Sequence, residues 1–521
     1  MVLLDLMFAS DENRGKWIYS KSDWEQSRKD LNMNETVNYF EKRSKDFPGE
    51  YLYKPCVERK DAEYRLEIME ELISREKLFT GISDFCLILR RYRTQLRDFK
   101  EDKHEIQKQY RFLLLFGEFA AAASSLLILL SDAKSAGLKK IYERCEKITT
   151  EKSVTAAYEN ASSLIREIAM ILKNTVLEIN TGEKIITIKE RETQCETELL
   201  REEIFETYAL KIKSDFPVTD PLPLSYLEEK VLKIHISKNP ETFDELENFY
   251  NNYSEALEND LKIFTDLLPQ LVFYITYAEF VKEAKKNGVP VCRPNFKNEG
   301  FSAFGALGIS MIIKFLAESR PLDEIVKNDV RLPKGKIFIL SGPNQGGKTV
   351  YLKMLGMTAY LAKCGCYVFS EECSLPFYDN IITHFMQKEV LGKSRLFEEI
   401  ERIENLSTQF NSDSLVLLNE SFTSTRRNDS LEIVVHYIEK FDKIGCSAGF
   451  VSHFYEIPEV YKNGENDIIS MQSGIEKSGE RTYKISENKG DGLAYARDIA
   501  KSCKMTYEQI IREIETAGGK N

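Results

Sequence analysis

Apolar residues spaced three and four apart dominate the chain up to about residue 290, where Gly and Pro are rare, so this part is predicted to be mostly helical. The clearest seam comprises Phe243, Leu246, Tyr250, Tyr253, Leu257, Leu261, Phe264, Leu268 and Leu271. This spacing predicts one long amphipathic helix with a coiled-coil-like seam, kinked at Pro269. The pattern suits an exposed arm and an ordinary core helix equally.

Two further segments stand out within this helical half. Phe112–Leu130 is the most apolar stretch, but Glu118 and two serines interrupt it, so we predict a buried core helix rather than a membrane span. Val176–Ile179 and Ile185–Ile188 flank a turn that contains Gly182, which predicts a short β-hairpin. Such a hairpin suits the tip of an arm and a simple surface decoration alike.

From about residue 291 the pattern changes to short aliphatic runs that alternate with helical stretches. Ile337–Leu340, Leu415–Leu418 and Ala448–Val451 are typical of buried strands, and the alternation predicts an α/β domain with a largely parallel sheet. The sequence therefore predicts a multidomain protein with a mostly α-helical N-terminal region and a C-terminal α/β domain. The predicted parts are a helical core over 1–110, a helical lever or arm over 111–290, and the α/β domain over 291–521.

Charge and cysteine content narrow the class of protein. The chain has 521 residues and a net charge of -11, which argues against a general nucleic-acid coat but leaves room for a local basic groove. None of the 10 cysteines forms a C-x-x-C pair. We therefore expect reduced, structural thiols in a cytoplasmic protein. Met1–Ser10 is apolar but has no basic segment before it, so no secretory signal is predicted.

A phosphate-binding loop lies between the strand Ile337–Leu340 and a helical stretch that starts near Val350. It fits G-x-x-x-x-G-K-[ST] in full and comprises Gly342, Pro343, Asn344, Gln345, Gly346, Gly347, Lys348 and Thr349. Its backbone amides and the helix N-terminus suit phosphate oxygens. Lys348 is expected to reach the β- and γ-phosphates, and Thr349 to bind Mg²⁺. The domain is thus predicted to be a P-loop ATPase domain.

Polar residues follow the other two predicted strands. Glu420 comes directly after Leu415–Leu418 and Asn419, and a carboxylate at that place suits a general base that orients the attacking water. Asn419 stands where an aspartate normally supports Mg²⁺, so we expect weaker metal binding and slow hydrolysis. His453 follows Ala448–Val451, where an imidazole can sense the γ-phosphate.

Taken together, these residues resemble the MutS family of DNA mismatch-recognition ATPases, which are of the ABC type. The match covers about residues 291–515, and the family's loop, GPNxxGK[ST], is more specific than a bare P-loop. Upstream, Val326-Lys-Asn-Asp329 resembles V-x-N-D, and Tyr367-Val368 resembles the YVPA strand. Gly392-Lys-Ser394 followed by Glu399 resembles the GRSTFMVEM signature helix, Leu417-Leu-Asn-Glu420 resembles LLDE, Asp429 falls at the STFDG aspartate, and Val451-Ser-His453-Phe resembles ATHY.

The resemblance implies roles for single residues. Asn344 contacts the phosphates, and Ser394 reaches across a dimer interface to the partner's γ-phosphate, so that ATP holds a head-to-tail dimer together. Asp429 lies near that interface. Ile325 stands where the family often stacks an aromatic residue on adenine, which puts base selectivity in question. The loop 421–427 lacks the glycine-rich GRGTST spacing of the family.

The preferred hypothesis is a DNA-associated clamp in DNA repair or recombination, a dimer switched by ATP and Mg²⁺ that selects DNA structure rather than sequence. Its candidate phosphate contacts are Arg90, Arg91, Arg93, Arg97, Lys100 and Lys103, with Tyr92 among them, although the same residues suit a solvated helix face. No segment is long enough for the family's mismatch-reading domain, so mismatch reading of the usual kind is not expected. The alternative is a nucleotide-switched protein scaffold without a direct DNA grip. An SMC- or Rad50-like ATPase is disfavoured, because the P-loop and Glu420 share one compact domain.

Overall fold

The chain divides into two compact units. The computed structural model describes residues 4–13, 23–101, 105–150, 152–173, 175–180, 185–190, 228–230, 232–234, 240–385, 395–422, 426–452, 457, 468–476, 480–487, 507, 509 and 511. One unit, here called the helical unit, comprises residues 1–9 and 70–275, and the other, the α/β unit, comprises residues 10–69 and 276–521. Helices α4 (Arg59–Ser74) and α11 (Glu241–Lys286) have residues in both.

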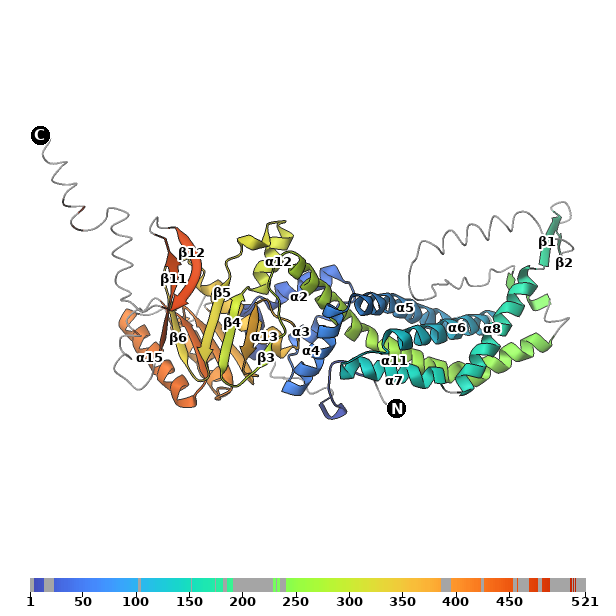
Figure 1. Ribbon diagram of the computed structural model, residues 1–521, viewed down its shortest axis with the longest axis horizontal. Coiled ribbons are helices and arrows are strands. Elements are labelled where there is room, and N and C mark those ends of the chain that lie inside the picture. Colours follow the sequence, from blue (N-terminus) through green and yellow to red (C-terminus); the bar gives the residue numbers. More distant parts are fainter. Residues whose placement is uncertain are drawn as a thin grey trace, which may run out of the picture. The chain divides into compact units, whose positions relative to one another are not determined.

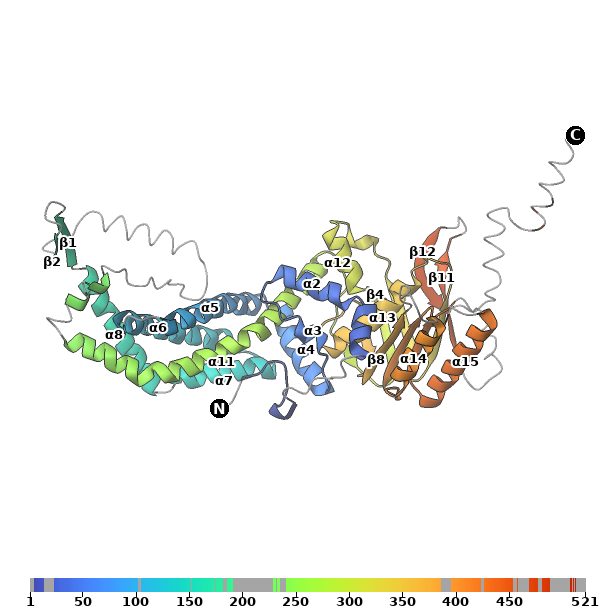
Figure 2. The same ribbon diagram turned by 180° about the vertical axis from the view of Figure 1, so that it is seen from behind.

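The helical unit is built from long helices that run beside one another (Figures 1 and 2). Besides parts of α4 and α11, its elements are α5 (Glu76–Glu101), α6 (Glu105–Leu129), α7 (Ala136–Thr150), α8 (Lys152–Lys173), β1 (Thr175–Asn180) and β2 (Ile185–Glu190). Helix α6 packs against α5, α7 and α8. The helical character predicted for this part of the chain is confirmed.

The apolar helix α6 supplies core side chains to the helical unit. By length and composition it is the one helix among the described residues that is apolar enough to cross a membrane. Its residues Phe112, Phe116 and Phe119 are nevertheless buried against neighbouring helices. Glu118, which interrupts the apolar run, is also buried and accepts a hydrogen bond of 2.9 Å from Arg91. A carboxylate held by a guanidinium suits a protein interior, in line with the predicted core helix.

The predicted seam helix and hairpin are both present. Helix α11 runs unbroken through Pro269, and its seam residues Leu261, Phe264 and Leu268 are buried. Strands β1 and β2 pair antiparallel, with Asn180 opposite Ile185. The turn that contains Gly182 lies outside the described residues.

The α/β unit combines N-terminal helices with two sheets. Its first elements are η1 (Asp11–Asn13), α1 (Asp23–Asp30), α2 (Met33–Arg43) and α3 (Glu50–Tyr53). Its remaining helices are α12 (Ile309–Ala317), η2 (Leu322–Glu324), α13 (Lys348–Lys363), α14 (Arg395–Ser407) and α15 (Arg427–Ile444). Its strands are β3 (Asn295–Phe296), β4 (Gly300–Ala306), β5 (Asn328–Pro333), β6 (Ile337–Ser341), β7 (Glu372–Leu375), β8 (Asn380–Phe385), β9 (Ser414–Asn419), β10 (Ser447–Val451), β11 (Ile469–Ile475) and β12 (Arg481–Glu487).

The larger sheet has the order β12-β11-β6-β10-β9-β8. Strands β11, β6, β10, β9 and β8 are parallel to their neighbours, and only β12 pairs antiparallel, with β11. The three strands predicted from the sequence are therefore central members of a largely parallel sheet, as expected. Their carboxyl ends meet at one edge, which is where polar residues after parallel strands can converge.

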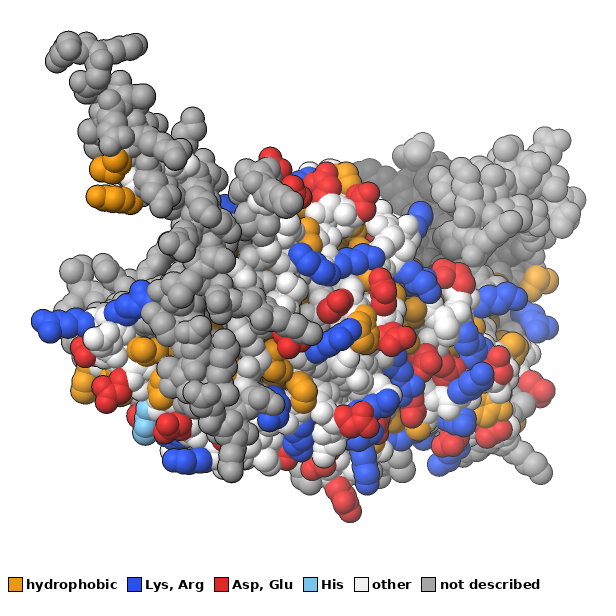
Figure 3. Space-filling model, turned by 60° about the vertical axis from the view of Figure 1, so that its left-hand side comes forward, with side chains coloured by type: hydrophobic (Ala, Val, Ile, Leu, Met, Phe, Trp, Pro, Cys, Tyr) orange, Lys and Arg blue, Asp and Glu red, His pale blue; other side chains and the backbone are white. Residues whose placement is uncertain are grey.

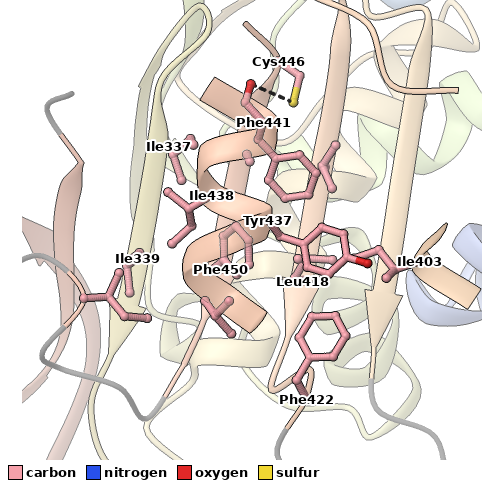
Figure 4. Packing of buried hydrophobic residues seen from close by; sticks show 14 residues of the cluster. Ile337, Ile339, Ile403, Leu418, Phe422, Tyr437, Ile438, Phe441, Cys446 and Phe450 are labelled. Atoms are coloured by element: carbon pink, nitrogen blue, oxygen red, sulfur yellow. Dashed lines mark hydrogen bonds between the residues drawn. The ribbon is translucent and has the colours of Figure 1, made fainter. Parts of the chain in front are cut away.

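Side chains alternate between the two faces of this sheet. On one face, Val416 and Leu418 join Phe441 and Tyr437 of α15 and Ile403 of α14 in a buried cluster (Figure 4). On the other face, Leu417 meets α13. A Cβ added to Gly356 of α13 would lie 2.8 Å from Leu417 and 2.6 Å from Leu31, so a larger residue would have to displace these side chains. The helix after the phosphate-binding loop is thereby fixed against the sheet.

A second sheet, of order β3-β7-β4-β5, was not predicted. Strand β4 pairs antiparallel with both β5 and β7. Tyr367-Val368, which resembles a strand of the family, forms only a single bridge, between Val368 and Cys292. Strand β5 begins at Asn328 and is followed by the turn before β6, so the segment Ile325–Asp329 leads into this sheet.

Candidate functional site

The phosphate-binding loop connects the carboxyl end of β6 to the first residue of α13. Gly342 and Gly347 have φ values of 132° and 88°, a region that L-residues with a side chain rarely adopt. A Cβ on Gly342 would also lie 2.9 Å from Cβ of Ser473 in β11. The glycines are thus required by the backbone path, and the helix N-terminus that follows presents amides suited to an anion.

Lys348 is the first residue of α13 and is almost completely buried. Its Nζ donates 2.9 Å hydrogen bonds to the carbonyl oxygens of Gly342 and Pro343. Burial lowers the pKa of Lys348 below its usual value, and the nearby Glu420 carboxylate opposes this shift. The ammonium group is therefore held inside the curl of the loop, with its charge only partly compensated by protein groups.

Thr349 and Asn419 bring the loop and strand β9 together. The Thr349 hydroxyl donates a 2.9 Å hydrogen bond to Oδ1 of Asn419, at the carboxyl end of β9. Asn419 is buried and carries no charge. The next residue, Glu420, has a φ of 51°, and its amide donates to the carbonyl of Val451 at the end of β10. Residues from three strand ends thus converge, as the parallel sheet predicts.

A cavity of about 480 Å³ opens beside these residues. The predicted residues that line it are Ile325, Gln345, Gly346, Gly347, Lys348, Thr349, Val350 and Glu420. Gly342 and Pro343 accept hydrogen bonds from the lining residue Lys348, and Asn419 accepts one from the lining residue Thr349. Asn344 is exposed at the loop and is not a lining residue, and Asp429 is exposed in the first turn of α15. Ser394 and His453 lie outside the described residues.

Beyond the loop, the cavity is lined by aliphatic and charged residues and by an aromatic residue that the sequence reasoning missed. Ile325 is 8% exposed, Val326 is 38% exposed, and Tyr483 of β12 is 48% exposed. Tyr483 lines the cavity, and its ring lies against Gly347, where an added Cβ would be 3.5 Å from Cδ1. The alternating pattern of Arg481–Glu487 was the available signal for this strand, but nothing local indicated that it pairs beside the loop.

The β11–β12 hairpin is hydrogen-bonded to the phosphate-binding loop. Ser473 Oγ donates to the carbonyl of Gly346 over 2.6 Å, and Arg481 donates to Oε1 of Gln345 over 2.8 Å. Asn328 forms two hydrogen bonds with the backbone of β12. Its Nδ2 donates to the carbonyl of Tyr483, and its Oδ1 accepts from the amide of Ile485. The Asn of the V-x-N-D segment therefore holds the hairpin that presents Tyr483.

The candidate DNA contacts on α5 are only partly available. Tyr92 is fully buried, and burial raises the pKa of its phenol. Arg91 pairs with the buried Glu118, whereas Arg93 is exposed. The side chains of Arg97, Lys100 and Lys103 lie outside the described residues. Tyr92 is therefore a core residue of the helical unit and not a surface aromatic.

Comparison with known proteins agrees with this geometry. Residues 338–510 match the family profile described as MutS domain V. The chain is 24% identical over 312 residues to a DNA mismatch repair protein MutS of Clostridium perfringens, a match that covers 54% of this chain and 33% of the relative. It is 27% identical over 211 residues to that of Listeria welshimeri, covering 38% and 24%, and 26% identical over 277 residues to that of Streptococcus equi, covering 50% and 32%. The chain spans about a third or less of the length of these relatives. Residues 338–510 of the chain are therefore similar to MutS domain V, and parts of the chain are similar to DNA mismatch repair proteins MutS.

Proposed function

We propose that the α/β unit binds and slowly hydrolyses ATP with Mg²⁺, and that nucleotide drives head-to-tail dimerisation and switches the helical unit, with DNA as the partner. One observation carries this proposal. Lys348, Thr349 with Asn419, and Glu420 converge on one cavity at the carboxyl edge of a parallel sheet. The direct test is ATP binding and Mg²⁺-dependent ATP hydrolysis by the full chain, with the oligomeric state followed by analytical ultracentrifugation.

The residues divide the chemistry of this reaction. Lys348 already donates two hydrogen bonds within the loop, so phosphate oxygens can replace the carbonyls of Gly342 and Pro343 as acceptors. Glu420 lines the same cavity and can accept a proton from a water aligned with the terminal phosphate. A fixed cation and a fixed base on either side of one phosphate are the positioning that phosphoryl transfer needs.

The donor set of Thr349 and Asn419 suits Mg²⁺. Their Oγ1 and Oδ1 atoms are 2.9 Å apart, and hydroxyl and amide oxygens are hard ligands of the kind this ion prefers. When bound, Mg²⁺ neutralises charge on the β- and γ-phosphates. The neutral amide of Asn419 supports the metal less strongly than a carboxylate does, which favours slow turnover.

Asn419→Asp is therefore expected to strengthen Mg²⁺ binding. A carboxylate restores one negative charge beside Thr349, and ligand charge is a principal determinant of divalent-ion affinity. We expect the Mg²⁺ concentration for half-maximal ATP hydrolysis to fall about 3- to 10-fold, an estimate from the worth of a charge-assisted contact. The measurement is a Mg²⁺ titration at fixed ATP. Equal half-maximal concentrations in the two proteins would refute this account of Asn419.

Apolar side chains in the cavity lining suit a nucleoside base. Ile325 and Val326 offer an aliphatic surface, and Tyr483 offers a half-exposed ring beside the loop. Aromatic contact with a base compensates for the missing aromatic at Ile325, because any planar base can stack on a tyrosine face. The triphosphate would then lie along Gln345–Thr349, and the base against these apolar side chains.

DNA binding rests on the family relationship and on charge. The relatives are DNA mismatch repair proteins by name, and the chain matches only part of them. On the face drawn in Figure 3, basic and acidic side chains are interspersed among the described residues rather than gathered into one basic field. We therefore propose local phosphate contacts, with selection of DNA structure rather than of sequence.

A salt titration of DNA binding separates the clamp from the second candidate, a nucleotide-switched protein scaffold, which Asn419 supports by favouring slow switching. Each phosphate contact releases counterions, so a clamp with about six contacts should lose roughly 1,000-fold in affinity between 50 and 200 mM salt. The measurement is fluorescence anisotropy with duplex, mismatched and branched DNA, with and without ATP. Absence of binding to every DNA at low salt would favour the scaffold.

A further inference from the structure

The loop that follows Glu420 adopts a backbone conformation that needs external support. Glu420 and Phe422 have φ values of 51° and 64°, in the left-handed region that bulky side chains avoid. Two such residues within three positions persist only where the surroundings hold them. The loop carries the candidate base, so whatever holds Phe422 also fixes the direction of Glu420.

Side chains from two helices, α14 and α15, hold this loop. Glu399 of α14 accepts a 2.8 Å hydrogen bond from the amide of Phe422 at Oε2. Ser430 of α15 donates to the carbonyl of Phe422 over 2.5 Å. The Phe422 ring is fully buried and stacks on Tyr437 at 5.4 Å, with an angle of 2° between the rings. Figure 4 shows Phe422 directly beside Tyr437 in the core under α15.

His384 secures the intervening residue, Ser421. The two side chains are 2.7 Å apart, and the Ser421 hydroxyl donates to the backbone carbonyl of His384 over 3.0 Å. The hydroxyl proton is thus committed, so His384 Nδ1 is the donor to Ser421. Burial and the nearby Arg402 lower the pKa of His384 to about 3, which keeps the imidazole neutral and fixes this arrangement.

We propose that Glu399 is a positioning residue for ATP hydrolysis, which fixes Glu420 through the amide of Phe422. This inference rests on the proposed function. Glu399 does not line the cavity, whereas Glu420 does, so Glu399 acts through the loop and not on the substrate. Among the contacts just described, Glu399 supplies the acceptor for the Phe422 amide, and the other side chains hold the carbonyl, the ring and Ser421. For the Phe422 amide, Glu399 supplies an acceptor oxygen at the end of its side chain, whereas its charge also interacts with the nearby Arg402 guanidinium.

This acceptor role makes the effects of two substitutions differ. Glu399→Gln keeps an oxygen that accepts from the Phe422 amide, and Glu399→Ala removes it. Glu401→Gln is the matched control, because Glu401 is exposed on the same helix and its change removes the same charge. Thermal unfolding of all three variants checks that each is folded.

The first measurement is amide hydrogen exchange, by mass spectrometry on peptides spanning 419–422, without nucleotide. We expect Glu399→Ala to speed exchange at Phe422 by roughly 10-fold or more, since amides whose hydrogen bonds open locally exchange faster. Glu399→Gln should change it little, and Glu401→Gln not at all. Exchange in Glu399→Ala at the wild-type rate would show that Glu399 does not hold this amide, and would overturn the proposal.

The second measurement is ATP binding and steady-state hydrolysis. We expect Glu399→Ala to lower kcat by about 10- to 100-fold with the Kd for ATP within about 2-fold, because a misplaced base impairs the chemical step and not binding. Glu399→Gln should recover most of kcat. A loss in Glu399→Gln as large as in Glu399→Ala, or a parallel loss of ATP affinity, would contradict positioning through an acceptor. If the wild-type chain hydrolyses no ATP, the proposed function fails and the positioning role with it, while the exchange result still decides whether Glu399 holds the loop.

Discussion

Lys348→Ala is expected to weaken ATP binding strongly and to reduce ATP hydrolysis still more. Lys348 is the buried cation of the loop, and its Nζ sits 2.9 Å from two loop carbonyls, at the place where phosphate oxygens would be received. Hydrogen bonds from a charged donor contribute about 1.5–3 kcal/mol each, so ATP affinity should fall roughly 10- to 100-fold. Hydrolysis should fall further, by about 100- to 1,000-fold, because the same charge stabilises the transferring phosphoryl group. Isothermal titration calorimetry and a phosphate-release assay measure the two effects.

Lys353→Ala serves as the control for this loss of a cation. Lys353 lies on the same helix, but its Nζ donates to Oδ1 of Asn32 over 2.7 Å and it does not line the cavity. We expect its ATP affinity to match wild type within about 2-fold, an allowance for altered packing around this partly buried side chain. ATP binding of undiminished strength in Lys348→Ala would remove the phosphate-binding assignment of the loop, and with it the proposed function.

The parts of the site that could be predicted are those that local sequence encodes. The run Ile337–Leu340 and the glycines after it specify a buried strand and a turn with positive φ, within a few residues of each other. Asn419 and Glu420 follow a second such strand, and parallel pairing brings the strand ends to one edge. Hydrophobic periodicity and turn preferences depend on residues that are close in sequence, so these elements can be predicted without knowing the fold.

The missed parts depend on contacts between distant segments. Tyr483 comes beside Gly347 only because β11 pairs with β6 and Asn328 fastens β12, contacts that span more than a hundred residues. The sheet that contains β4 was also missed, since Gly300–Ala306 is rich in small residues and shows no clear alternation. The contact between Glu399 and Phe422 spans 23 residues and joins a helix to a loop, a pairing that no local pattern specifies. Tyr92 was predicted to lie on the surface because it is surrounded in sequence by basic residues, although it belongs to the buried face of its helix.

Glu420→Gln is expected to separate ATP binding from ATP hydrolysis. Glutamine has the shape of glutamate and can keep the left-handed backbone that the amide contact with Val451 supports. It cannot accept a proton, so the attacking water loses its base, and general-base catalysis contributes about 100- to 10,000-fold. We expect kcat to fall by at least about 100-fold while ATP still binds, with Lys348 and Thr349 unchanged. Because ATP would bind but not be hydrolysed, the ATP-bound dimer should accumulate. Sedimentation velocity detects this dimer.

The control and the opposing outcomes follow from the position of this residue. Glu439→Gln removes an equal charge from an exposed site on α15 and should leave kcat and sedimentation as in wild type. An unaltered kcat in Glu420→Gln would exclude Glu420 as the base. A chain that loses hydrolysis but stays monomeric with ATP would keep the base and remove the dimer from the proposal. Glu420 lies between Asn419 and the loop held by Glu399. Under the proposed function, a base with weak metal support on one side depends all the more on the rigidity of the loop on its other side. The increase in activity caused by Asn419→Asp should therefore be smaller in the Glu399→Ala variant than in the wild-type chain. Stronger metal binding cannot realign a misplaced Glu420 carboxylate.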